Sequence, residues 1–143
     1  MKELNEGDKA PAFKELAANK DRIVILYFYP KDDTPGCTTE ACELRDAHKQ
    51  IVTKHAVVLG VSPDSAKSHE KFATKFNLPF SLVPDEDHKL CEAYGVWKEK
   101  SMYGRKYMGV ERTTFVIGPD GIIKKIFRKV KAAGHAEEVL SVI

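Results

Sequence analysis

Cysteine is scarce in this chain of 143 residues, which contains three cysteines. So few thiols do not build the disulfide framework of a small secreted domain and are more typical of transient redox chemistry in a reducing compartment. No Cys-x-x-Cys pair is present, which argues against a disulfide oxidoreductase of the thioredoxin type. The histidines form no His-x-x-x-His pair, so zinc is disfavoured and no metal or other cofactor is expected. The five histidines are His48, His55, His69, His88 and His135.

A charge imbalance and a long apolar segment are also missing. Lysine and arginine total 23 and aspartate and glutamate 21, and the lysines are spread along the chain, so no nucleic-acid partner is expected. The first six residues lack the apolar core of a signal peptide, and no apolar run is long enough to span a bilayer. We therefore expect no membrane partner and a cytoplasmic location. The length and the 43% hydrophobic content fit one domain over residues 1–143.

The most informative stretch begins with seven unbroken apolar residues, Ile23–Tyr29, which predict a strand buried on both faces. Apolar residues at helical spacing then predict a helix over residues 38–54. In the turn between them, Thr34 is a candidate N-cap and Pro35 suits the first helical position. Cys37 would then lie in the first helical turn, where unpaired N–H groups and the helix dipole favour an anion. A thiolate is easier to form there, so Cys37 is a candidate nucleophile.

Each of these features alone has an ordinary explanation, because most cysteines are small buried hydrophobes and most helix caps have no catalytic role. Their combination is specific. The pattern Pro30-x-x-x-Thr34-x-x-Cys37 resembles the active-site signature of the peroxiredoxins, and residues 27–38 resemble the peroxiredoxin Q, or bacterioferritin comigratory protein, subfamily. The resemblance runs from Gly7 to the last predicted helix. It implies a thiol peroxidase with a thioredoxin-like fold.

The resemblance also implies roles for individual residues. Cys37 would be the peroxidatic cysteine, which attacks hydrogen peroxide or an organic hydroperoxide and becomes a sulfenic acid. Thr34 would supply a hydroxyl to the reacting oxygens, Arg112 would pair with the thiolate and the peroxide, and Pro30 would shield the sulfur. Cys42 would be the resolving cysteine, which forms an intramolecular disulfide with Cys37. Thioredoxin or a similar dithiol would then reduce this disulfide.

Two alternatives remain open. Cys91 lies in a predicted short helix where some members of the resembled family place a resolving cysteine, so it could replace Cys42 in that role. The chain could instead be a thioredoxin-fold interaction module with inert, buried thiols. Because resolution within one chain needs no partner subunit, we expect a monomer.

The remaining segments predict an α/β fold with a central mixed β-sheet flanked by helices. Residues 1–21 look irregular, with a short edge strand near Pro11 and Phe13. Residues 96–111 lack periodicity and predict a lysine-solvated loop with its aromatic side chains folded inward. The other expected elements are strands at 56–61, 81–83, 112–117 and 122–127, a helix after the cap-like Ser62-Pro63 that ends at Asn77, a short helix capped by Asp87, and a helix over 134–142.

Overall fold

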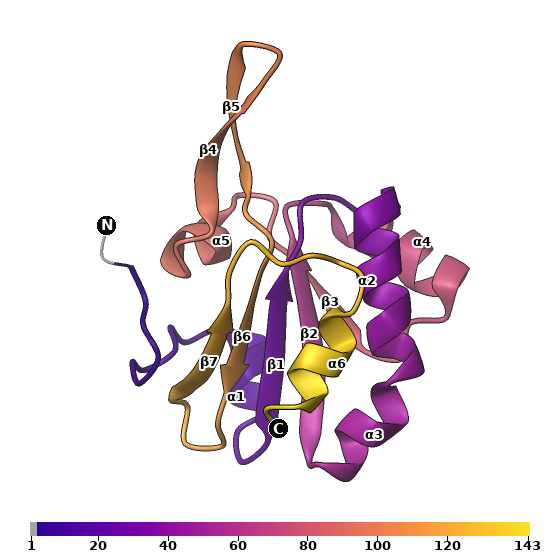
Figure 1. Cartoon of the computed structure of the whole chain (residues 1–143), viewed down its shortest axis with the longest axis vertical. Coiled ribbons are helices and arrows are strands. Elements are labelled where there is room, and N and C mark those ends of the chain that lie inside the picture. Colours follow the sequence, from indigo (N-terminus) through magenta and orange to yellow (C-terminus); the bar gives the residue numbers. More distant parts are fainter. Residues whose placement is uncertain (1–2) are drawn as a thin grey trace.

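A five-stranded mixed β-sheet forms the centre of the computed structural model, which describes residues 3–143 (Figure 1). Its strands are β1 (Ile23–Phe28), β2 (Ala56–Ser62), β3 (Ser81–Pro84), β6 (Thr113–Ile117) and β7 (Ile123–Phe127). They lie in the order β3-β2-β1-β6-β7. Strands β1, β2 and β3 are parallel, whereas β6 is antiparallel to both β1 and β7. The predicted mixed sheet is confirmed, with β1 at its centre.

Strand β1 supplies side chains to two separate hydrophobic cores because successive residues of a strand point to opposite faces. Val24, Leu26 and Phe28 belong to the core on one face. Ile25 and Tyr27 belong to the core on the other. This arrangement explains the unbroken apolar run, since a strand covered on both faces has no polar side.

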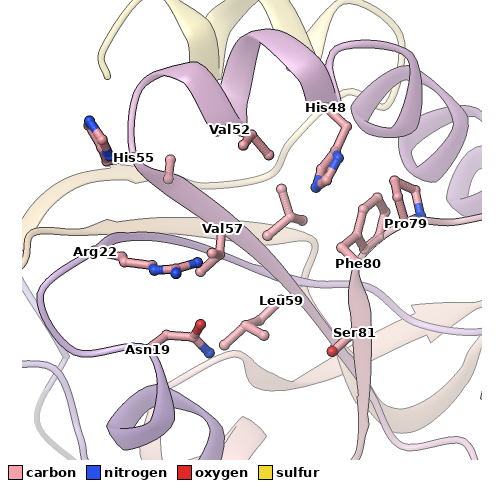
Figure 2. Close-up of a pocket in the computed structure, with 12 residues that line it drawn as sticks. Asn19, Arg22, His48, Val52, His55, Val57, Leu59, Pro79, Phe80 and Ser81 are labelled. Atoms are coloured by element: carbon pink, nitrogen blue, oxygen red, sulfur yellow. The ribbon is translucent and has the colours of Figure 1, made fainter.

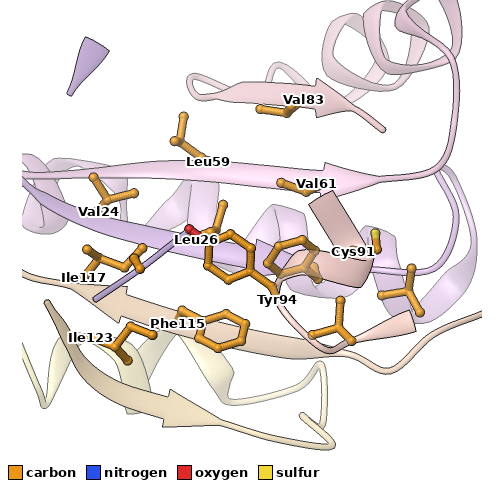
Figure 3. Close-up of a cluster of buried hydrophobic side chains, with 14 residues drawn as sticks. Val24, Leu26, Leu59, Val61, Val83, Cys91, Tyr94, Phe115, Ile117 and Ile123 are labelled. Carbon is orange, nitrogen blue, oxygen red and sulfur yellow. The ribbon is translucent and has the colours of Figure 1, made fainter. Parts of the chain in front are cut away.

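Helices cover both faces of the sheet (Figures 1 and 3). On the first face lie α1 (Lys14–Ala18) and α5 (Lys89–Ala93), and Figure 3 shows Cys91 and Tyr94 packed there. On the second face lie α2 (Pro35–Asp46), α3 (His48–Thr53), α4 (Ala66–Phe76) and α6 (His135–Leu140). Within residues 3–143, no helix has both the length and the apolar character that crossing a membrane requires.

The single helix predicted to run to residue 54 is wrong in its extent. Helix α2 begins at Pro35, the first helical position that the Thr34-Pro35 pair indicated, and it ends at Asp46. Ala47 then interrupts the helix with φ −88° and ψ −1°, and α3 follows. No glycine or proline marks this break, and Leu44 and Ile51 on its two sides belong to the same core.

Two predicted helix caps are also corrected. Ser65, rather than Ser62-Pro63, caps α4, and its hydroxyl accepts a hydrogen bond from the Ser68 N–H at 3.1 Å. At the start of α5 the carboxylate of Asp85 accepts from the N–H groups of Leu90 and Cys91 at 3.0 and 2.8 Å. The predicted cap, Asp87, makes only a 3.4 Å contact with Lys89.

Residues 96–111 do not form the predicted loop. They form an antiparallel hairpin of β4 (Trp97–Met102) and β5 (Arg105–Val110) that projects from the body of the molecule (Figure 1). Tyr103 at the turn is 98% exposed, so the aromatic side chains are not all folded inward. Because most of the hairpin is solvated on both faces, its sequence lacks the apolar alternation that reveals a half-buried strand.

The N-terminal segment also differs from its prediction. Helix α1 was not predicted, and no edge strand forms at Pro11 and Phe13. A single antiparallel bridge between Lys9 and Ile122 takes its place.

Candidate active site

Cys37 is positioned by the turn that connects the central strand β1 to α2. Thr34 is the N-cap of α2, with extended backbone angles, and Pro35 is the first helical residue. Cys37 is therefore the third residue of the helix, and it is only 1% exposed. The predicted placement of this thiol in a first helical turn agrees with the structure, so its sulfur lies near the positive end of the helix dipole.

Arg112, just before β6, brings a cation to this sulfur. Its Nη2 donates a hydrogen bond to Cys37 Sγ at 3.3 Å, and its Nη1 donates to Glu40 Oε1 at 2.6 Å. The guanidinium thus bridges two acceptors that lie one helical turn apart on α2. Burial lowers the pKa of Arg112, but the charges of Glu40 and Cys37 outweigh this and raise it above its usual value, so the cation persists.

Glu40 is a site residue that the sequence reasoning missed. Its side chain is fully buried, and burial raises its pKa from 4.5 to about 7 even though Arg112 opposes the change. Its second oxygen, Oε2, has no hydrogen-bond partner among the described residues. The available signal was its spacing, because residues i and i+3 of a helix share a face and Glu40 follows Cys37 by three.

Thr34 and Pro30 lie in the same turn but do not bond directly to Cys37. The hydroxyl of Thr34 donates to the carbonyl oxygen of Lys31 at 2.8 Å and makes no side-chain cap on α2. This bond leaves the lone pairs of the hydroxyl oxygen available as acceptors. Pro30, two residues after the end of β1, is half-buried and presents no N–H group.

The other two cysteines occupy different environments. Cys42 is half-buried on α2, the same helix as Cys37, and all three cysteines are free thiols. Cys91 is buried on the opposite face of the sheet, in the core shown in Figure 3. Burial and the neighbouring Asp85 carboxylate raise the pKa of Cys91, so its thiol stays protonated.

A surface groove of about 400 Å³ lies at the other end of the sheet (Figure 2). It is lined by residues at the start of β2 and β3, such as Val57 and Ser81, together with Arg22 and His48. Cys37 follows the carboxyl end of β1, so the groove is separate from the Cys37 cluster.

Comparison with known proteins places the chain in a family. The AhpC/TSA family profile matches residues 3–126. Peroxiredoxin Bcp of Bacillus subtilis is 50% identical over 138 residues, which cover 96% of this chain and 87% of that protein. This chain is a peroxiredoxin of the AhpC/TSA family.

Solved structures extend the likeness to the fold. A cysteine-to-serine variant of Xylella fastidiosa PrxQ matches this peroxiredoxin with a TM-score of 0.92 and 42% identity, covering 99% of this chain and 96% of that one. The bacterioferritin comigratory protein of Xanthomonas campestris matches with a TM-score of 0.84 and 46% identity, covering 88% and 80%. The predictions of a thioredoxin-like fold and of a thiol peroxidase of the peroxiredoxin Q type are confirmed.

Proposed function

We propose that Cys37 is the peroxidatic cysteine of this enzyme and that Arg112 is the cation that stabilises its thiolate. The hydrogen bond from Arg112 Nη2 to Cys37 Sγ carries this proposal, because it joins a helix N-terminal thiol to a fixed cation. A thiolate is the reactive form of cysteine, and both the helix dipole and the guanidinium favour it. The sulfur is almost fully enclosed, so these interactions act with little screening by water.

The proposed reaction transfers two electrons from sulfur to the peroxide. The Cys37 thiolate attacks one oxygen of the hydroperoxide, so that an S–O bond forms while the O–O bond breaks. The departing oxygen takes a proton and leaves as water or an alcohol, and Cys37 becomes a sulfenic acid. Negative charge grows on the departing oxygen in the transition state, and the Arg112 guanidinium stabilises that charge.

Thr34 and Pro30 orient the substrate in this proposal. Because the Thr34 hydroxyl donates to the carbonyl of Lys31, its oxygen can accept a hydrogen bond from the O–H of the peroxide. Accepting that bond would hold the O–O axis in line with the sulfur, which lowers the entropic cost of the reaction. Pro30 limits the approach of water because its ring carries no donor.

We assign Cys42 as the resolving cysteine. Its thiol would displace the sulfenic oxygen of Cys37 as water, forming an intramolecular disulfide. In a regular helix, five residues advance about 7.5 Å and rotate roughly 140°, which separates the two Cα atoms by about 8–9 Å. A disulfide generally needs Cα atoms within about 7 Å. The first turns of α2 must therefore unwind before the bond can form.

The alternatives fit the structure less well. Cys91 lies across the sheet from Cys37, so a bridge between them requires one thiol to leave its core and pass the edge of the sheet. A module with inert thiols offers no reason for a half-buried arginine to donate a hydrogen bond to a cysteine sulfur. Both observations favour Cys37 and Cys42 as the reacting pair.

We further propose hydrogen peroxide and organic hydroperoxides as substrates, and thioredoxin or a similar dithiol as the reductant. The Xanthomonas campestris relative is described in terms of alkyl peroxide reduction activity, which supports the organic substrates. A monomer suffices, because both cysteines belong to one helix. The same proposal places the enzyme in the cytoplasm, where dithiol reductants keep cysteines reduced.

Peroxide consumption coupled to thioredoxin, thioredoxin reductase and NADPH tests this proposal. We expect steady turnover in the wild type, none in Cys37→Ser, and near wild-type turnover in the matched control Cys91→Ser. Peptide mapping after one equivalent of peroxide should reveal a Cys37–Cys42 bridge. Turnover in Cys37→Ser would overturn the assignment of the nucleophile, and a mapped Cys37–Cys91 bridge would overturn that of the resolving thiol.

A further inference from the structure

A second buried polar cluster holds the loop that leads into the Cys37 helix. At its centre is Asp32, two residues before the N-cap Thr34, with a side chain only 5% exposed. One carboxylate oxygen accepts from the Tyr29 hydroxyl, and the other accepts from Ser68 and faces His69 Nδ1 at 2.7 Å. The backbone N–H of Asp32 also donates to Asp64 at 2.6 Å. We name this set the loop anchor: Tyr29, Asp32, Asp64, Ser68 and His69.

His69 carries a positive charge in the loop anchor. Its Nδ1 faces the Asp32 carboxylate, and its Nε2 faces the carbonyl oxygen of Val83 on β3 at 3.1 Å. Both partners are acceptors only, so each ring nitrogen must carry a hydrogen. Burial alone would lower the pKa of His69, but the hydrogen bond and charge of Asp32 raise it above its usual value. The anchor is therefore a buried, fully hydrogen-bonded ion pair.

The loop anchor holds the loop against elements of the fold that contain neither Cys37 nor Cys42. Ser68 and His69 belong to α4, and Val83 belongs to β3. On the other side of the turn, Cys37 is held by Arg112 and Glu40. The segment that contains Cys37 is thus fastened at two independent points.

We propose that Asp32 and His69 are positioning residues that hold the loop before Cys37, so that their ion pair sets how readily α2 unwinds after peroxide reduction. This inference rests on the proposed function of Cys37 and Cys42. Unwinding of α2 pulls on the loop at Thr34, two residues from Asp32. An intact anchor resists that pull and prolongs the time the Cys37 sulfenic acid spends in the folded pocket.

The loop anchor therefore influences which of two reactions the Cys37 sulfenic acid undergoes. If α2 unwinds, the Cys42 thiol attacks, and a disulfide and water form. If α2 stays folded, a second peroxide oxidises the sulfenic acid by two more electrons, which adds a second oxygen to sulfur and releases water or an alcohol. The ratio of sulfinic acid to disulfide on Cys37 therefore reports how firmly the loop is held.

The test measures this ratio by mass spectrometry across a peroxide titration, with thioredoxin present, in His69→Gln and Asp32→Asn. A lost hydrogen bond to a charged group changes an equilibrium by roughly tenfold or more, so the peroxide concentration that gives half-maximal sulfinic acid should rise about tenfold. The double variant should shift it no further than the larger single effect, because both substitutions break one ion pair. Hydrogen exchange at the Asp32 N–H should quicken in the oxidised wild type.

Tyr94→Phe is the matched control. It removes another buried hydrogen bond, from Tyr94 to the carbonyl of Pro11 at 2.7 Å, on the far face of the sheet. This variant should lose global stability but keep the wild-type ratio. Equal ratios in His69→Gln and wild type, or an equal shift in Tyr94→Phe, would overturn the inference.

A less disruptive variant covers the case in which the substitutions at Asp32 and His69 prevent folding. Ser68→Ala removes one hydrogen bond to Asp32 from a helical position that tolerates alanine. It must shift the ratio in the same direction, and an unchanged ratio would also overturn the inference. Failure of the proposed function looks different, because Cys37 would then acquire no sulfinic acid in any variant.

Discussion

Replacing Glu40 by glutamine tests whether a buried carboxylate limits the charge that Arg112 offers to Cys37. Glutamine keeps nearly the same volume and an oxygen that can accept the 2.6 Å hydrogen bond from Arg112. It removes the negative charge. We expect this change to affect both the pH dependence of folding stability and the ionisation of the thiol.

The stability effect follows from the raised pKa of Glu40. Burial moves this pKa from 4.5 in the unfolded chain to about 7 in the folded protein. A carboxyl group whose pKa is raised on folding stabilises the folded state below about pH 4.5, and that contribution is lost as the pH rises through 7. Between pH 5 and pH 8 the wild type should therefore lose about 2–3 kcal/mol through Glu40 alone. Glu40→Gln should lack this loss.

The thiol effect follows from the spacing of the two side chains. Cys37 and Glu40 are i and i+3 on α2, so their Cβ atoms lie roughly 5–6 Å apart. Two negative charges at that separation repel by about 3 kcal/mol at an effective dielectric constant near 20. Arg112 lies between them and reduces the repulsion. Removing the Glu40 charge leaves the thiolate of Cys37 less opposed, so we expect the pH midpoint of Cys37 alkylation to fall in Glu40→Gln.

Two assays measure these effects. Denaturant unfolding at pH 5 and pH 8, with a reductant present, gives the stability of both proteins. Alkylation rates against pH, in a background without the thiols of Cys42 and Cys91, give the midpoint for Cys37. Glu137→Gln, an exposed position on α6, is the matched control for the chemical change and should alter neither quantity. A stability difference that is the same at both pH values would refute the reasoning about burial, and an unchanged alkylation midpoint would refute the electrostatic coupling.

Three further predictions concern the same site. Arg112→Ala should raise the pH midpoint of Cys37 alkylation and slow peroxide reduction. Arg112→Lys should show smaller changes of the same kind, because a point charge replaces a planar fork of donors. An unchanged midpoint and rate in both variants would remove Arg112 from the site. Gly36→Ala should slow peroxide reduction, because the new Cβ would lie 3.1 Å from Arg112 Nη2 and displace the guanidinium. It should not lower stability, because alanine favours helices. A wild-type rate would show that the guanidinium moves freely. In Cys42→Ser, hydrogen exchange over residues 36–46 should stay slow after oxidation, whereas the oxidised wild type should exchange quickly there. Equal protection in both proteins would contradict the unwinding of α2.

The sequence alone determined the centre of this fold and the placement of the Cys37 thiol. Both depend on neighbours along the chain. The apolar run Ile23–Tyr29 needs only its own side chains to indicate a strand buried on both faces. Thr34 and Pro35 start a helix through local backbone preferences, which places Cys37 in the first turn wherever that helix packs.

Tertiary structure decided what surrounds that thiol. Arg112 is separated by 72 residues from Glu40 and by 75 from Cys37 along the chain, and only the pairing of β6 with β1 brings them together. Asp32 and His69 are likewise 37 residues apart, and their ion pair forms because α4 packs near the end of β1. No local pattern encodes such contacts, because their free energy comes from burial and charge pairing between distant segments. The raised pKa of Glu40 has the same origin, since a carboxyl group on an isolated helix would face water.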